Sequence, residues 1–283
     1  MRNNQPVTQR EVSLGPQQKL ISTTDARGVI TYCNDAFVDI SGFDKVDLIG
    51  APQNIVRHPD VPPAVFAHMW AALKLGKPWM GIVKNRSKTG DHYWVNAYVT
   101  PVFEGSQVVG YESVRVKPTA EQIRRAEALY KRLSQGKSAV PVGDKWQPAL
   151  LASLPVLAMG LVGTLGGAYL GMAPAIALAV AVSVPIGLFV SRQQNQGALR
   201  LLDMAEASTS DALLAKMYSD ERGPQARLET AFVSQTSRLK TCLTRLQDTA
   251  EQLNQLAGRS DGLAADSSRG LERQRVETEQ VST

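Results

Sequence analysis

Cysteine and histidine are scarce in this chain, and their scarcity excludes several kinds of site. Only two cysteines occur in 283 residues, Cys33 and Cys242, and they lie far apart in what we expect to be separate domains. Such a pair fits a reducing compartment and no disulfide. The three histidines, His58, His68 and His92, show no zinc-type spacing with cysteines or carboxylates.

The sequence also shows no nucleophile–base pair, no phosphate-cradling loop and no cluster of metal ligands. We therefore expect a protein that is not an enzyme. The N-terminal segment Met1–Leu14 is polar and has no apolar region of the kind that a secretory signal peptide needs. The formal net charge is +5, and much of the excess comes from Lys and Arg beside one apolar segment, so we expect no nucleic-acid binding.

Charge is missing from one long segment, Trp146–Ser191, which contains no Lys, Arg, Asp, Glu or His. A helix needs about 20 apolar residues to cross the hydrocarbon core of a bilayer, so this segment is long enough for two crossings. Near its middle, Gly171–Pro174 is typical of a turn. The pattern predicts a membrane hairpin over residues 146–191, with one helix at 149–170 and a second at 175–190.

Two other readings of this segment stay open. The second helix is short and contains Pro185, which also fits a tilted or re-entrant hairpin. A buried helical pair would share the lack of charge, although little sequence remains to enclose it. Basic residues flank the hairpin on both sides, and such flanks stay in the cytoplasm. We therefore expect an inner-membrane protein with both termini cytoplasmic. The basic residues are Arg124, Arg125, Lys131, Arg132, Lys137, Lys145, Arg192 and Arg200.

The part before the hairpin reads as an α+β domain. Turn residues and β-branched or aromatic runs predict five strands, at 20–24, 29–32, 79–85, 92–103 and 108–116. Between the second and third strands, Asn34-Asp35 caps a short helix, and Pro62-Pro63 opens a longer helix that ends near Leu75. This order predicts one antiparallel sheet with its helices grouped on one face.

Several ordered motifs in this domain resemble a known family. They are Asn34–Phe37, Ser41–Phe43, Gln53–Pro62, Met69-Trp70, Gly76–Arg86 and Gly90–Val95. Together they resemble the flavin-binding PAS domain of bacterial aerotaxis receptors, and the resemblance covers roughly residues 7–135. It implies a PAS sensor domain at 20–118 that binds FAD. It also implies that Arg57, His58 and Asp60 lie in the flavin-contacting stretch and that Trp79 lies against the cofactor.

The chemistry of the same residues suits a flavin dinucleotide. Aromatic side chains suit the flat faces of the ring, for which Trp79 and Trp70 are candidates, although Trp70 also fits a core position. The amide of Asn85 can pair with the polar edge of the ring. Arg57 can bind the pyrophosphate in a bidentate manner. We expect His58 beside Arg57, Asp60 orienting Arg57 or accepting from a ribose hydroxyl, and Asn34 touching the pocket.

Two rival interpretations of the pocket stay open. A haem-binding PAS domain needs an axial histidine, and both His58 and His68 are candidates. A PAS domain without a cofactor would only dimerise or dock onto chemoreceptors. A photochemical flavin adduct is disfavoured, because residues 53–59 contain no cysteine.

The chain after the domain is mostly helix-forming. Residues 119–145 form a helix and a loop that link the domain to the hairpin, and residues 192–224 loosely resemble a HAMP-like relay with a helix at 197–217. Apolar residues then recur at spacings of four and three from Leu228 to Leu263, which favours a parallel homodimeric coiled coil over a lone amphipathic helix.

The whole chain therefore divides into six parts. They are an N-terminal cap (1–19), the sensor domain (20–118), the linker (119–145), the hairpin (146–191), the HAMP-like relay (192–224) and a coiled coil with a frayed tail (225–283). In chemoreceptors a long helical hairpin that controls a histidine kinase follows, and the sequence stops before it. We expect a membrane-anchored redox or oxygen sensor for aerotaxis, with other chemoreceptors and a histidine kinase complex as partners. Signalling would change how the domain packs on the later helices.

Overall fold

The computed structural model describes residues 4–141 and 211–281, together with the short pieces 143–144, 150, 153–154, 156–158, 160–161, 181–182 and 184–190. The chain divides into two compact units, Met1–Ser237 and Arg238–Thr283. Of the predicted membrane helices at 149–170 and 175–190, the structure describes only the short pieces given above, and the rest lies outside the described residues. Within the described part, no helix is both long and apolar enough to cross a membrane.

The first unit is built around a five-stranded antiparallel sheet with the strand order β2-β1-β5-β4-β3. The strands are β1 (Leu20–Asp25), β2 (Ile30–Cys33), β3 (Trp79–Arg86), β4 (His92–Glu104) and β5 (Gln107–Val116). All five strands predicted from the sequence are therefore confirmed, with bounds shifted by at most a residue or two. The predicted α+β class with a five-stranded antiparallel sheet is confirmed with them.

Helices between β2 and β3 form the layer on one face of the sheet. They are α1 (Asp35–Ser41), α2 (Lys45–Leu48), the 3-10 turn η1 (Gln53–Val56) and α3 (Pro63–Lys74). Asn34 begins α1 because its side chain accepts from the N–H of Phe37, and Gly42 ends it at φ 65°, a conformation that favours glycine. Pro63 begins α3 in the first turn, where its missing N–H costs nothing.

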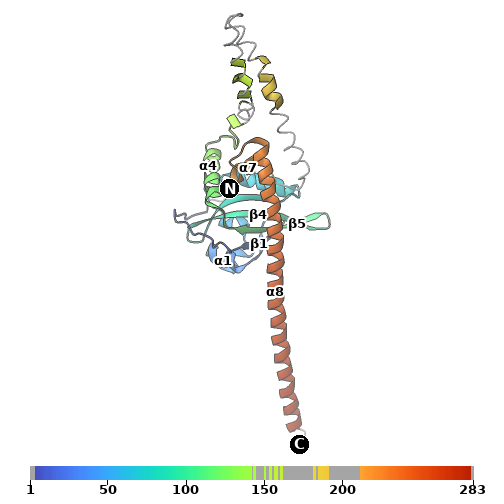
Figure 1. Ribbon diagram of the computed structural model, residues 1–283. Coiled ribbons are helices and arrows are strands. Elements are labelled where there is room, and N and C mark those ends of the chain that lie inside the picture. The colour runs from blue at the N-terminus through green and yellow to red at the C-terminus, as the bar shows by residue number, and fades with distance from the viewer. Residues whose placement is uncertain are drawn as a thin grey trace, which may run out of the picture. The chain divides into compact units, whose positions relative to one another are not determined.

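The other face of the sheet is covered by helices that come later in the chain. α4 (Ala120–Ser134) begins with a capping box between Thr119 and Gln122, and α7 (Ala212–Tyr218) packs against α4 and β3. Figure 1 shows α1 and α4 on opposite sides of the sheet. The sequence predicts α4 only as a linker, but the structure makes it a second layer of the domain.

Side-chain alternation along the strands separates the two faces. On β4, Trp94 faces outward and stacks on Tyr130 of α4 with ring centroids 6.0 Å apart, and Asn96 accepts a hydrogen bond from Tyr218 of α7 at 2.7 Å. Ala97 and Val99, at odd positions of the same strand, line a cavity on the inner face. The inner face therefore belongs to the candidate site and the outer face to the later helices.

The last described helix, α8 (Gly223–Val281), runs for 59 residues without a break. The sequence predicts fraying after Gly270, but the helix continues to Val281 because this stretch contains good helix formers and no proline. The structure also differs from the single helix predicted at 197–217: Asp211 is extended at φ −110° and ψ 171°, and α7 begins directly after it. Residues 191–210 lie outside the described part.

Candidate functional site

The inner face of the sheet encloses a cavity of about 110 Å³ between the strands and α3. A single water needs roughly 10–15 Å³, so the space suits an organic group. One wall is aromatic and apolar, and the other carries amides, hydroxyls and two guanidinium groups. The lining residues are Ser22, Thr24, Gly28, Gln53, Asn54, Val56, Arg57, Phe66, Met69, Trp70, Leu73, Trp79, Val83, Asn85, Ala97, Val99, Tyr111, Ser113 and Arg115.

The aromatic wall is fixed by close packing over glycines. Trp79, which is fully buried, lies directly over Gly81, where an added Cβ would sit 2.3 Å from Cη2 of the indole. Trp70 meets Tyr111 edge to face, with centroids 5.3 Å apart. Trp70 also covers Gly28, where an added Cβ would lie 3.1 Å from the ring. Both tryptophans named from the sequence therefore line the cavity.

The polar wall is organised by Arg115 at the end of β5. Its Nη1 donates to Oγ of Ser22 at 3.0 Å, and that hydroxyl in turn donates to Oε1 of Gln53 at 3.1 Å. The guanidinium also lies 5.2 Å from the ring of Phe37. Burial lowers the pKa of Arg115 to about 10, so it remains a cation at neutral pH. A buried positive charge therefore faces the cavity.

Arg57 supplies the second guanidinium, at the end of η1. Its Nη2 donates to the carbonyl of Val61 at 2.7 Å, and its Cζ lies 4.6 Å from the ring centroid of Phe66. Burial lowers the pKa of Arg57. Its backbone pairs with that of Asn85 on β3, which brings these two predicted site residues together at the cavity.

The N-terminal segment holds this loop in place. The side-chain amide of Asn4 donates to the carbonyls of Asn54, Ile55 and Arg57 at 2.8–3.1 Å. The predicted cap segment thus fastens the loop that carries Arg57.

Several buried polar atoms at the cavity have no hydrogen-bond partner among the described residues. They are Oγ1 of Thr24, Nε2 of Gln53, Nε of Arg57 and Oγ of Ser113. A buried polar group without a partner costs about 1–3 kcal/mol. The cavity therefore suits a ligand that offers acceptors to its donor-rich wall and a flat apolar face to its tryptophans.

Three predicted site residues lie elsewhere among the described residues. Asn34 is tied to the start of β1, donating to the carbonyl of Lys19 at 2.9 Å and accepting from the N–H of Ile21 at 3.0 Å. Asp60 does not orient Arg57, because it pairs with Lys84 at 2.7 Å. His58 is buried beside Asp60, with its Nδ1 3.5 Å from the carboxylate. None of Asn34, His58 and Asp60 lines the cavity.

Electrostatics around His58 favour its neutral form. Burial, followed by the charge of Lys84, lowers the pKa of His58 to about 4. Burial alone would raise the pKa of Asp60, but the hydrogen bond from Lys84 and the nearby charges hold it below its usual value. His92 lies edge-on to His58 with centroids 5.8 Å apart, and burial lowers the pKa of His92 as well. His58, Asp60, Lys84 and His92 thus form a polar cluster that does not line the cavity.

Sequence reasoning missed Arg115, Gln53 and Ser22 as cavity residues. Arg115 has the same strand parity as Ser113 and Tyr111, which also line the cavity. Because alternate residues of a strand face the same side, Arg115 could have been assigned to the inner face together with Tyr111 and Ser113. Gln53 and Ser22 carry no such signal, because their meeting depends on how η1 folds back onto β1.

Comparison with known proteins agrees with this architecture. The family model described as the PAS fold matches residues 30–115. The aerotaxis receptor of Escherichia coli K12 is 49% identical over 133 residues, which are 47% of this chain and 26% of that protein. A nitrogen fixation regulatory protein of Klebsiella pneumoniae is 34% identical over 82 residues, 29% of this chain and 17% of that protein. The chain therefore spans about a quarter or less of the length of these relatives.

Solved structures include one reported for a flavin analogue in a light-oxygen-voltage domain. It is 20% identical, covers 42% of this chain and 90% of its own, and has a TM-score of 0.36. The match with the PAS fold model and the five-stranded sheet together show that the chain contains a PAS domain similar in sequence to that of a receptor.

Proposed function

We propose, on the premise that this chain carries a PAS domain related to that of a bacterial aerotaxis receptor, that it is a redox or oxygen sensor whose PAS cavity binds FAD. The observation that carries the proposal is the two-sided cavity, with Trp79 and Trp70 on one wall and Arg115, Arg57 and amide donors on the other. A cavity of this kind suits a ligand with a flat face and a polar edge. Among the described residues there is no group of metal ligands.

The residues present fit a flavin. Trp79 and Trp70 suit the faces of its ring, and Asn85, Gln53 and Arg115 suit the acceptors along its edge. Arg57 suits the pyrophosphate. When bound, FAD supplies a ring that accepts and returns electrons. The protein's own part is to hold that ring between fixed walls and to keep a positive charge beside it.

The structure favours FAD over haem. The two candidate axial ligands are His58 and His68, and neither is among the residues that line the cavity. Both ring nitrogens of His68 already have partners, in Trp79 and Asp211. The remaining alternative is a PAS domain that binds no cofactor. This alternative predicts that the purified protein is colourless.

Flavin content of purified variants tests the assignment of the site. Arg57→Ala and Trp79→Phe should each lower the FAD content per chain at least severalfold. Arg27→Ala is the matched control, since Arg27 is an exposed arginine of the same domain that pairs only with Asp25 in the described part. Full stoichiometry in both site variants would rule out these roles for Arg57 and Trp79.

For assembly, we propose a parallel homodimer through α8. Six positions of the predicted seam carry large apolar side chains that are 60–71% exposed in the single chain: Phe232, Leu239, Leu246, Leu253, Leu256 and Leu263. Gln235, Thr249 and Ser260 are polar positions of the same seam and would weaken it. A narrow apolar row at this spacing is typical of a coiled-coil seam. Other chemoreceptors and a histidine kinase complex are the proposed output partners, in keeping with the related receptor.

We further propose that residues 146–191 anchor the protein in the inner membrane as a hairpin, with both termini in the cytoplasm. The support is the charge-free segment and its basic flanks. Reporter fusions test it: a reporter active only in the cytoplasm should work at either terminus. A reporter that is inactive at one terminus would contradict the hairpin, as would recovery of the whole chain outside the membrane fraction.

A further inference from the structure

A hydrogen-bonded chain leads away from the cavity at Trp79. The indole Nε1–H donates to Nδ1 of His68 at 3.0 Å, and Nε2 of His68 meets the carboxylate of Asp211. Trp79 begins β3, His68 lies on α3, and Asp211 precedes α7. Three segments far apart in sequence therefore meet through three side chains.

The direction of each bond follows from chemistry. An indole N–H can only donate, so Nδ1 of His68 must accept and carries no proton. The neutral imidazole then has its proton on Nε2, where it donates to Asp211. Burial would raise the pKa of Asp211, but the bond from His68 and the helix N–H groups lower it, so the carboxylate stays charged. Each group in the chain thus has one fixed role.

Asp211 joins this chain to the start of α7. Its Oδ1 accepts from the N–H groups of Leu213 and Leu214 at 2.8 and 3.0 Å, which makes it the N-cap of the helix. One oxygen of this carboxylate therefore accepts the hydrogen bond from His68, and the other accepts those from the backbone of α7. A shift of His68 would therefore move the carboxylate that caps the first turn of α7.

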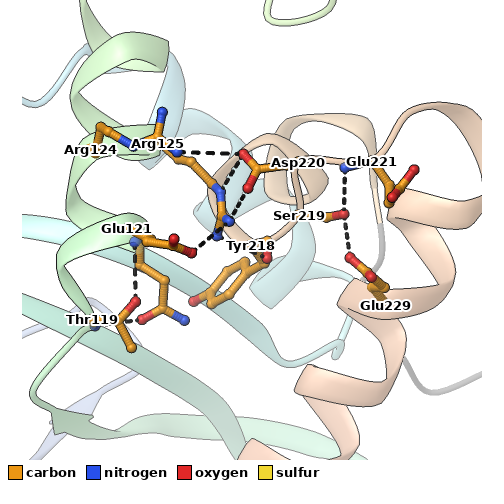
Figure 2. Close-up of polar contacts among 10 residues, drawn as sticks. Thr119, Glu121, Arg124, Arg125, Tyr218, Ser219, Asp220, Glu221 and Glu229 are labelled. Atoms are coloured by element: carbon orange, nitrogen blue, oxygen red, sulfur yellow. Dashed lines mark hydrogen bonds and ion pairs between the residues drawn. The ribbon is translucent and has the colours of Figure 1, made fainter.

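The far end of α7 is held on the outer face of the domain. Leu214, Met217 and Tyr218 are buried in the same core cluster as the sheet. Beyond Tyr218, the carboxylate of Asp220 binds the guanidinium of Arg125 on α4, as Figure 2 shows. These contacts involve no residue that lines the cavity. Among the described residues, the polar connection between the start of α7 and a cavity residue runs through His68.

We propose that Trp79, His68 and Asp211 form a relay that reports the state of the ligand in the cavity to α7. This inference rests on the proposed function, since it names how the same site is read. Trp79 is pinned over Gly81. A ligand that changes charge against the indole changes how strongly its N–H donates to His68, while the ring stays packed on Gly81. The bond to His68 weakens, and the hold of His68 on the N-cap of α7 weakens with it.

Hydrogen exchange of the α7 amides tests the relay in the full chain loaded with FAD. Reduction should change the exchange rate over residues 212–218 by about twofold to tenfold, the range that one hydrogen bond supports. His68→Phe keeps an aromatic ring but removes both bonds, and it should abolish this difference while leaving the FAD content intact. A wild type without the difference, or a His68→Phe variant that retains it, would overturn the relay.

Two further variants separate the relay from simple loosening of α7. Asp211→Ser keeps a capping side chain that is too short to reach His68, so it should also abolish the difference. Lys216→Met breaks the ion pair of Lys216 with Asp144 at 2.5 Å, away from His68. It should raise α7 exchange in both redox states and preserve the difference between them. Loss of the difference in Lys216→Met as well would contradict a specific route.

A last arm needs no flavin and so distinguishes failure of the relay from failure of the proposed function. In protein stripped of any ligand, Trp79→Phe and His68→Phe should each speed α7 exchange. Both substitutions break the same series of hydrogen bonds. The α7 amides of the double variant should therefore exchange no faster than those of the His68→Phe variant. Additive effects would show that no relay exists, whether or not the protein binds FAD.

Discussion

The PAS cavity and the C-terminal part of α8 use apolar side chains in opposite ways. In the PAS domain such side chains are enclosed, and it is polar atoms, on Thr24, Gln53 and Ser113, that lack partners among the described residues. Over residues 249–271 of α8, polar side chains and leucines alike are exposed. The first pattern suits a small polar-edged ligand, and the second suits another apolar helix. The protein thus has one surface suited to ligand binding and another suited to helix pairing. A substitution can therefore change one of these without changing the other.

The α8 seam should respond most strongly. Leu246→Asp with Leu253→Asp places charges in an apolar interface and removes two leucines from it. We expect the dimer dissociation constant to rise at least about 100-fold, since each leucine lost from a packed interface costs roughly 2–5 kcal/mol. Sedimentation analysis measures it, with Asn254→Asp as a control for charge beside the seam. FAD content should not change; an unchanged dimer would refute the seam.

The packing of Trp79 on Gly81 should give the next largest effect. Gly81→Ala puts a methyl group 2.3 Å from the indole, which should cost about 1–3 kcal/mol of unfolding free energy and lower FAD content. Urea unfolding measures the stability. Gly15→Ala is the matched control, because its added Cβ would meet only ordinary contacts at 3.7 Å. If both variants behave alike, the aromatic wall is not held as described.

Acid should weaken the PAS domain through His58. The pKa of His58 is about 4 in the folded protein and about 6.5 in an unfolded chain. Between these values the unfolded state binds more protons, so stability falls as the pH drops from 6.5 toward 4. The loss should be of order 2 kcal/mol. His58→Gln should flatten this dependence in urea unfolding at pH 7 and 4.5, and a variant with the wild-type slope would contradict the assignment.

The smallest expected effect concerns α7. Tyr218→Phe removes the hydrogen bond to Asn96 at 2.7 Å, which should cost about 1 kcal/mol. Exchange of the α7 amides should speed up about fivefold, while the dimer and the FAD content stay unchanged. An effect on FAD content would show that the outer and inner faces of the sheet are not separate.

The strands and the main helices could be predicted because their signals are local. Runs of β-branched and aromatic residues between turns predicted β3, β4 and β5, and Pro63 and Gly42 marked helix ends at positions where the structure has them. The aromatic wall could be named because the resemblance to aerotaxis receptors implies that Trp79 lies against the cofactor, and because tryptophan suits the flat face of a ring. The start of α7 also had a local signal, in the run of Ser and Thr before Asp211, which favours an N-cap.

The remaining site features depend on contacts across the chain. Asn34 was assigned to the pocket, but its own capping bonds hold it at the start of β1. Asp60 was expected to orient Arg57 or to accept from a ribose hydroxyl, whereas the fold brings Lys84 from β3 to it. The meeting of His68 with Asp211, 143 residues away, leaves no trace in any local pattern. Sequence spacing alone cannot supply such pairs.

The visible absorption spectrum of the purified full chain, recorded before and after chemical reduction, tests the central claim most directly. The account predicts a yellow protein with about one FAD per chain, whose flavin absorption is lost on reduction and returns in air. A colourless protein that takes up no FAD on incubation would contradict it and leave the chain as a docking module.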